Sequence, residues 1–191
     1  MDRFVGILRD SKSWAGITLV ILVIGIGWIG ISAVPAYSTT GGLIPSPKEG
    51  FLTPDFTLET LDGGEITLSE LRGQPVILNL WASWCPPCRA EMPALQMVFE
   101  ANRESGLEVL AVNMTSQDSQ SSAKNFADQN GLTFTIPLDR LGLVSNIYQS
   151  RALPSTFFVD RQGVIQKVVI GGPMSEVLLE SVVEMLLSEG E

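Results

Sequence analysis

The chain of 191 residues contains no histidine and only two cysteines. The missing histidine removes the commonest metal ligand and general base, and it excludes Ser-His-Asp and Cys-His mechanisms of the usual kind. Two cysteines cannot build a structural zinc site, which needs four nitrogen or sulfur ligands. Arg89 follows the second cysteine, so the pair is not a C-x-x-C-H haem-attachment motif. We therefore predict no metal and assign no cofactor.

Basic residues are also scarce, at 12 against 21 acidic ones, which gives a formal net charge of -9. Nucleic-acid binding needs a basic face that can contact phosphates. The charge balance therefore argues against a nucleic-acid partner, and it is typical of a solvated acidic surface.

One long uncharged run, residues 14–34, stands near the N-terminus. As a helix of roughly 21 residues it would be about 31 Å long, which matches the hydrocarbon core of a bilayer. A secretory signal has a shorter apolar region of about 7–15 residues. We predict an uncleaved transmembrane anchor, although residues 34–36 also resemble a cleavage site and leave a cleaved signal as the alternative.

Flanking charge predicts the orientation of this segment. Arg3, Arg9 and Lys12 precede it, and the first basic residue after it is Lys48. The positive-inside rule therefore places residues 1–13 in the cytoplasm and residues 35–191 on the outer side of the membrane. Residues 35–50 are rich in Pro, Gly, Ser and Thr and are interpreted as a linker.

Residues 51–191 alternate between strand-like and helix-like patterns, which indicates one α/β domain with a mixed central sheet and helices on both faces. The predicted strands are 56–59 and 65–67, which form a hairpin, then 75–81, 107–114, 134–138, 155–160 and 164–170. The predicted helices are a short turn at 69–73, a helix from the first cysteine to about 105, then 118–130, 141–149 and 174–188.

The two cysteines, Cys85 and Cys88, follow the buried strand 75–81 and open a helix. Free N–H groups and the helix dipole stabilise a thiolate at such a position, so we expect the pKa of Cys85 to fall below the usual value of about 8.5. Cys88 lies one turn further along and is predicted to be more buried. This asymmetry suits two-step thiol–disulfide exchange. The alternative is a permanent bridge, which would add little stability because it closes a very short loop.

The motif W-x-x-W-C-x-x-C-R at 81–89 and a later Leu-Pro before Phe-Phe-Val-Asp resemble the thioredoxin superfamily. The segments 54–58 and 85–95 resemble its membrane-anchored TlpA/ResA-like group. The resemblance covers roughly residues 51–189. It implies a thioredoxin-like fold with an N-terminal β-hairpin and a central insertion, most of it supplied by residues 118–138.

The resemblance also suggests roles for single residues. Pro154 matches the family's cis-proline, which faces the cysteines and presents backbone to a substrate, with Leu153 before it. Glu91 matches an acidic residue beside the cysteines that could accept or relay a proton; the alternative is a solvated helix carboxylate. Asn79 stands where thioredoxins carry a buried aspartate, and an asparagine cannot take that proton.

Three residues around the cysteines complete the predicted substrate site. Trp84 is predicted to form an exposed edge of the substrate groove, with Pro86 and Pro87 beside it, whereas Trp81 is predicted to lie in the core.

The resemblance implies a thiol–disulfide oxidoreductase that reduces cysteine pairs of exported proteins, for example apocytochrome c, and is itself reduced by a membrane electron donor. A disulfide oxidase or isomerase on the same fold stays open, because the Pro-Pro dipeptide does not settle the reduction potential. A peroxiredoxin-like thiol peroxidase is a further alternative, although Ala82 stands where those enzymes carry Thr or Ser. A copper-delivery module would need a histidine, which the chain lacks.

Overall fold

The computed structural model of the protein describes residues 20–24 and 44–188. The chain divides into two compact units, residues 1–42 and 43–191, of which the second contains the cysteines. Residues 20–24 are helical, but no helix among the described residues is both long and apolar enough to cross a bilayer. The predicted N-terminal segment 1–13, most of the predicted anchor 14–34 and residues 35–43 of the predicted linker lie outside the described residues.

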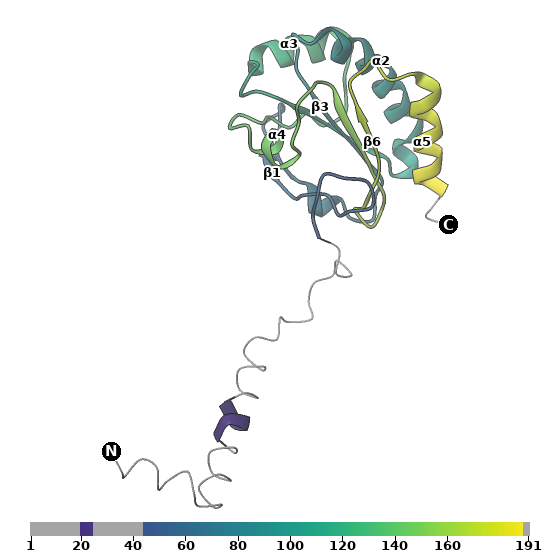
Figure 1. Cartoon of the computed structure of the whole chain (residues 1–191). Helices are drawn as coiled ribbons and strands as arrows, with labels where there is room; N and C mark the ends of the chain where they lie inside the picture. The colour runs from purple at the N-terminus through teal and green to yellow at the C-terminus, as the bar shows by residue number, and fades with distance from the viewer. Residues whose placement is uncertain (1–19, 25–43, 189–191) are drawn as a thin grey trace, which may run out of the picture. The chain divides into compact units, whose positions relative to one another are not determined.

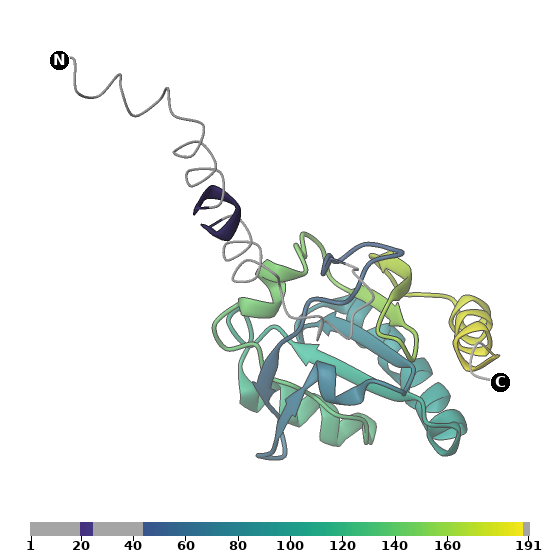
Figure 2. The same ribbon diagram turned by 90° about the horizontal axis from the view of Figure 1, so that it is seen from below.

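The second unit is an α/β domain in which helices lie on both sides of a four-stranded sheet (Figures 1 and 2). In chain order its elements are β1 (Thr57–Glu59), β2 (Glu65–Thr67), η2 (Leu68–Leu71), β3 (Val76–Trp81), α2 (Pro86–Asn102), η3 (Arg103–Ser105), β4 (Glu108–Asn113), α3 (Gln120–Asn130), α4 (Leu143–Ile147), β5 (Ser155–Val159), β6 (Ile165–Ile170) and α5 (Glu176–Ser188).

The sheet has the strand order β4-β3-β5-β6. β3 pairs parallel with β4 and antiparallel with β5, and β5 pairs antiparallel with β6. All six residues of β3 are buried, as the continuous apolar run predicted. The mixed sheet and the separate β1–β2 hairpin are both confirmed.

Side chains alternate across β3 and so divide the core in two. Ile77 and Trp81 face the side covered by α2, α3 and α5. Leu78 and Leu80 face the other side, which the β1–β2 hairpin, η2 and the α4 region cover. In the view of Figure 1, α2 and α3 lie above β3, and α4 and β1 lie below it to the left. Asn79 points to the α2 side, because it alternates with Leu78 and Leu80.

The predicted strand 134–138 is wrong. Only isolated bridges form there, from Thr135 to Leu110, from Pro137 to Thr60 and from Leu138 to Asn113. The segment bridges alternately to β4 and to the residue after β1, so no continuous row of backbone hydrogen bonds forms with either strand. The predicted helix 141–149 shortens to α4, which begins after Gly142 in the left-handed region (φ 70°).

Candidate active site

The two cysteines lie at the N-terminus of α2. Cys85 is the N-cap residue, and its Sγ accepts a hydrogen bond of 3.3 Å from the backbone N–H of Cys88. Pro86 and Pro87 occupy the first turn of the helix, where a missing N–H has no helical partner to lose. Because the N–H of Cys88 and the positive end of the helix dipole both meet the sulfur of Cys85, a thiolate at this position is stabilised.

Cys85 and Cys88 are joined by a disulfide, with their Cα atoms 5.3 Å apart. Cys88, within α2, is fully buried, whereas Cys85 is 3% exposed and lines a groove at the surface. An incoming thiol or disulfide therefore meets Cys85 first, and the pair has the geometry that two-step exchange needs.

The groove beside Cys85 has a volume of about 360 Å³. It brings together four residues of the predicted substrate site: Trp84, Pro86, Pro87 and Leu153. The predicted exposure of Trp84 is confirmed, and its indole Nε1 donates a hydrogen bond of 2.9 Å to the carbonyl of Gln117. Sequence reasoning missed the opposite contributors, which include Met114, Gln117 and Arg151.

The Leu153–Pro154 peptide bond is cis, as the resemblance implied. Pro154 is buried and does not line the groove, while Leu153 before it does. The carbonyl of Pro154 accepts a hydrogen bond from the N–H of Gly171, so its backbone is already paired within the domain. The groove therefore presents Leu153 to a ligand.

Glu91 lies on α2, one turn after Cys88, and its side chain is only 2% exposed. Its carboxylate accepts hydrogen bonds from Asn79 Nδ2 at 2.8 Å and from the N–H of Met174 at 3.3 Å. Burial raises the pKa of Glu91, and the two hydrogen bonds only partly offset that effect. The alternative of a solvated surface carboxylate is therefore wrong.

The loop after β6 packs over Glu91 and Pro154 together. A Cβ on Gly172 would lie 2.8 Å from Pro154 Cγ and 2.9 Å from Glu91 Oε2, closer than side chains tolerate. Glycine is thus required by this close approach. Asn79 Nδ2 also donates to Thr156 Oγ1 at 2.9 Å, which connects Glu91 to β5.

The sequence predicted Asp118 only as a possible start of a helix, but in the structure its carboxylate joins two loops of the site. Its carboxylate accepts hydrogen bonds from the N–H and the hydroxyl of Ser83, at 2.6 and 2.8 Å, and from Asn113 Nδ2 at 2.9 Å. Burial would raise the pKa of Asp118, but these hydrogen bonds and one from the N–H of Ser119 lower it. Asp118 thus ties the loop after β4 to the turn before Cys85.

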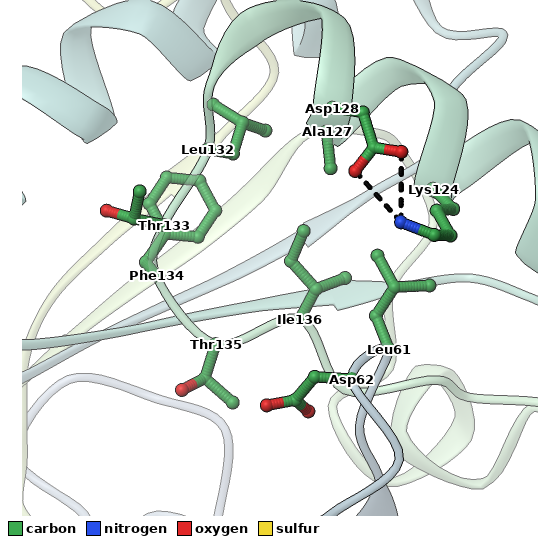
Figure 3. A pocket seen from close by; sticks show the side chains of 10 residues that line it. All are labelled: Leu61, Asp62, Lys124, Ala127, Asp128, Leu132, Thr133, Phe134, Thr135 and Ile136. Carbon is green, nitrogen blue, oxygen red and sulfur yellow. Dashed lines mark hydrogen bonds and ion pairs between the residues drawn. The ribbon is translucent and has the colours of Figure 1, made fainter.

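A second hollow, shown in Figure 3, lies between the β1–β2 turn and the C-terminal half of α3. Leu61, Ile136 and the Lys124–Asp128 ion pair of 2.9 Å face into it. It contains neither cysteine and none of the predicted site residues. The groove beside Cys85 is therefore the better candidate for the active site.

Comparisons with known proteins agree with this geometry. Residues 50–168 match the AhpC/TSA family. The chain is 39% identical to thioredoxin-like protein YneN of Bacillus subtilis over 162 residues, which cover 84% of this chain and 91% of YneN. It is 40% identical to thiol-disulfide oxidoreductase ResA of Geobacillus kaustophilus over 122 residues, or 64% of this chain and 69% of ResA. A solved structure of a secreted Mycobacterium tuberculosis disulfide oxidoreductase, homologous to E. coli DsbE, is similar with a TM-score of 0.62 and 28% identity, covering 69% of this chain and 96% of that one.

Proposed function

Since this chain belongs to the AhpC/TSA family and is a thiol–disulfide oxidoreductase of the ResA type, we propose that it reduces disulfides of exported proteins outside the cytoplasm. The observation that carries the proposal is the Cys85–Cys88 pair at the start of α2, in which Cys85 lines a groove and the fully buried Cys88 does not. The disulfide form is the product of one reductive turnover.

The reaction begins from the dithiol. The Cys85 thiolate attacks one sulfur of the substrate disulfide, forms a mixed disulfide and releases the other substrate sulfur as a thiolate, which takes up a proton. The Cys88 thiol then loses its proton and attacks Cys85 Sγ. This step releases the second substrate thiol and forms the Cys85–Cys88 bond, so two electrons have passed to the substrate.

Glu91 is our candidate acceptor for the proton of Cys88. It lies one helical turn from Cys88 and is buried, and burial raises its pKa, which makes it a better proton acceptor than a solvated carboxylate. Asn79, beside it, cannot accept that proton but orients the carboxylate.

The protein is also proposed to be anchored in the membrane and to work with a membrane partner. The uncharged segment 14–34, with basic residues before it, supports a membrane anchor with an external catalytic domain. A similar protein of known structure is described as secreted. We propose protein substrates with oxidised cysteine pairs, such as those of apocytochrome c, and a membrane electron donor that restores the dithiol.

Mixed-disulfide trapping tests the division of labour between the cysteines. Cys88→Ser should accumulate mixed disulfides through Cys85, because the resolving thiol is missing, while Cys85→Ser should trap few. The measurement is a comparison of non-reducing and reducing gels of the two variants in cells. Equal trapping by both, or none by either, contradicts the assignment.

The reduction potential tests the direction of electron flow. A reductase should have a potential near or below about -250 mV, whereas an oxidase lies near about -120 mV. Equilibration of the protein with glutathione or dithiothreitol buffers, read out by thiol alkylation, measures it. A value near the oxidase would replace the proposed reduction with disulfide formation.

A further inference from the structure

Arg151 gives the groove beside Cys85 an unbalanced positive charge. Apart from Cys85 itself, it is the one ionisable side chain that lines the groove; the other walls are apolar or neutral, such as Trp84, Met114 and Gln117. An arginine keeps its charge at any pH that a protein tolerates. A ligand in the groove therefore meets one cation on a largely apolar surface.

No carboxylate within the described part of the chain neutralises Arg151. Ion pairs there join Lys124 to Asp128, Arg140 to Glu59 and Lys167 to Glu49, but none involves Arg151. Its side chain is exposed and makes no hydrogen bond to another described residue. The guanidinium is therefore free to pair with a group that a substrate brings.

Two hydrogen bonds hold the backbone around Arg151 at the wall of the groove that Cys85 also lines. Ser155 Oγ and Ser150 Oγ both donate to the carbonyl of Ala152, at 2.7 and 3.3 Å. Arg151 stands two residues before Leu153, which lines the same groove as Cys85. A polypeptide joined to Cys85 through its own cysteine, and lying in this groove, would contact this wall close to that cysteine.

We propose that Arg151 is a specificity-determining residue that selects protein disulfides carrying Asp or Glu within a few residues of the reacting cysteine, with an apolar neighbour for Trp84 and Leu153. This inference rests on the proposed reductase function and defines its substrate class. The net charge of -9 repels acidic substrates from the protein as a whole, so the selection is local to the groove.

Three synthetic peptides test the selection. Each carries one disulfide and differs only in the residue beside the reacting cysteine, which is Glu, Gln or Lys. The full-length protein, reduced and kept in detergent, is the catalyst, and kcat/KM is measured at low and high salt. The Glu peptide should exceed the Lys peptide by about fivefold at low salt, an effect of the size that exposed charge pairs give. High salt should reduce the difference, because it screens exposed charges.

Variants of Arg151 and of a distant arginine distinguish a local effect of Arg151 from the effect of the protein's overall charge. Arg151→Gln should remove the preference, and Arg151→Glu should reverse it. Arg103→Gln is the matched control, because Arg103 is exposed at the opposite end of α2 and should leave the preference unchanged.

The neutral Gln peptide distinguishes failure of the proposed reductase function from failure of the proposed role of Arg151. If wild type and all variants reduce the Gln peptide alike but show no Glu-over-Lys preference, the role of Arg151 is overturned while the reductase function stands. Equal loss of preference in Arg103→Gln would also overturn it. If no peptide is reduced, the proposed function fails, and the inference that rests on it fails as well.

Discussion

Glu91 has a carboxylate that water hardly reaches, yet it accepts only two hydrogen bonds, from Asn79 and Met174. A negative charge on Glu91 repels a thiolate at Cys85, so that each group raises the pKa of the other. Glu91→Gln keeps the shape and removes the titration, so the variant should show a lower Cys85 pKa. It should also reduce disulfides more slowly near neutral pH, because Cys88 loses its proton acceptor.

Thiolate absorbance and the rate of disulfide reduction, each followed across pH, measure both effects. Glu184→Gln, on an exposed turn of α5, is the control and should match the wild type. If the Glu91→Gln curves superimpose on those of the wild type, Glu91 has no part in exchange.

The same substitution has a predicted effect on stability. The pKa of Glu91 is raised in the folded protein, mainly by burial, so the native state binds more protons than the unfolded state between the unfolded and folded pKa values. The free energy of unfolding of the wild type should therefore fall as pH rises through that window. Glu91→Gln should lack this fall, and urea unfolding at several pH values measures the difference. A parallel pH dependence in both proteins would contradict the prediction.

At single positions, the sequence predicted the cysteine pair, the cis peptide bond before Pro154 and the exposure of Trp84, because local motifs and the family pattern mark them. It could not predict how deeply Glu91 is buried. That depth depends on Gly172 and Met174, more than 80 positions later, and no local pattern links such distant residues.

Among the elements, the loop after β4 stabilises the turn that leads into α2, since Asp118 accepts both donors of Ser83. Asp118→Ala removes this acceptor and should lower the free energy of unfolding by about 1–2 kcal/mol. Because Trp84 and Gln117 line the groove from these two loops, the KM for a protein disulfide should rise more than the kcat falls.

Urea unfolding and steady-state kinetics measure these changes, and Asp118→Asn should recover part of the stability. Asp128→Ala is the control, because its ion pair with Lys124 is exposed and contributes at most about 0.5 kcal/mol. Equal losses in Asp118→Ala and the control would show that Asp118 does not position the turn.

Elements with strong local signals were predicted within a few residues. For α3 these signals are the Ser119 cap, whose Oγ accepts from the N–H of Ser122 at 3.0 Å, and Gly131 in the left-handed region (φ 61°). Residues 134–138 have the apolar character of a strand but no single partner strand. Pairing is a tertiary property, so composition alone misassigned them.

For the whole molecule, the proposed membrane topology, with the C-terminus outside the cytoplasm, can be tested with a fusion protein. A reporter that is active only after export, fused to the C-terminus, should be active, and the fusion should sediment with membranes. The physical reason is the uncharged segment 14–34 with its basic residues on the N-terminal side. An inactive reporter contradicts the orientation, and an active reporter found wholly in the soluble fraction contradicts the anchor.

The site is assembled from segments spread along most of the chain, and this has a consequence for biosynthesis. Cys85 and Cys88 leave the ribosome long before Leu153, which completes the groove, and before Met174, whose N–H bonds Glu91. A nascent chain therefore carries a bare pair of thiols with neither the groove wall nor the buried carboxylate around it. Oxidants that meet the chain in this interval react with cysteines that do not yet have the properties of the finished enzyme.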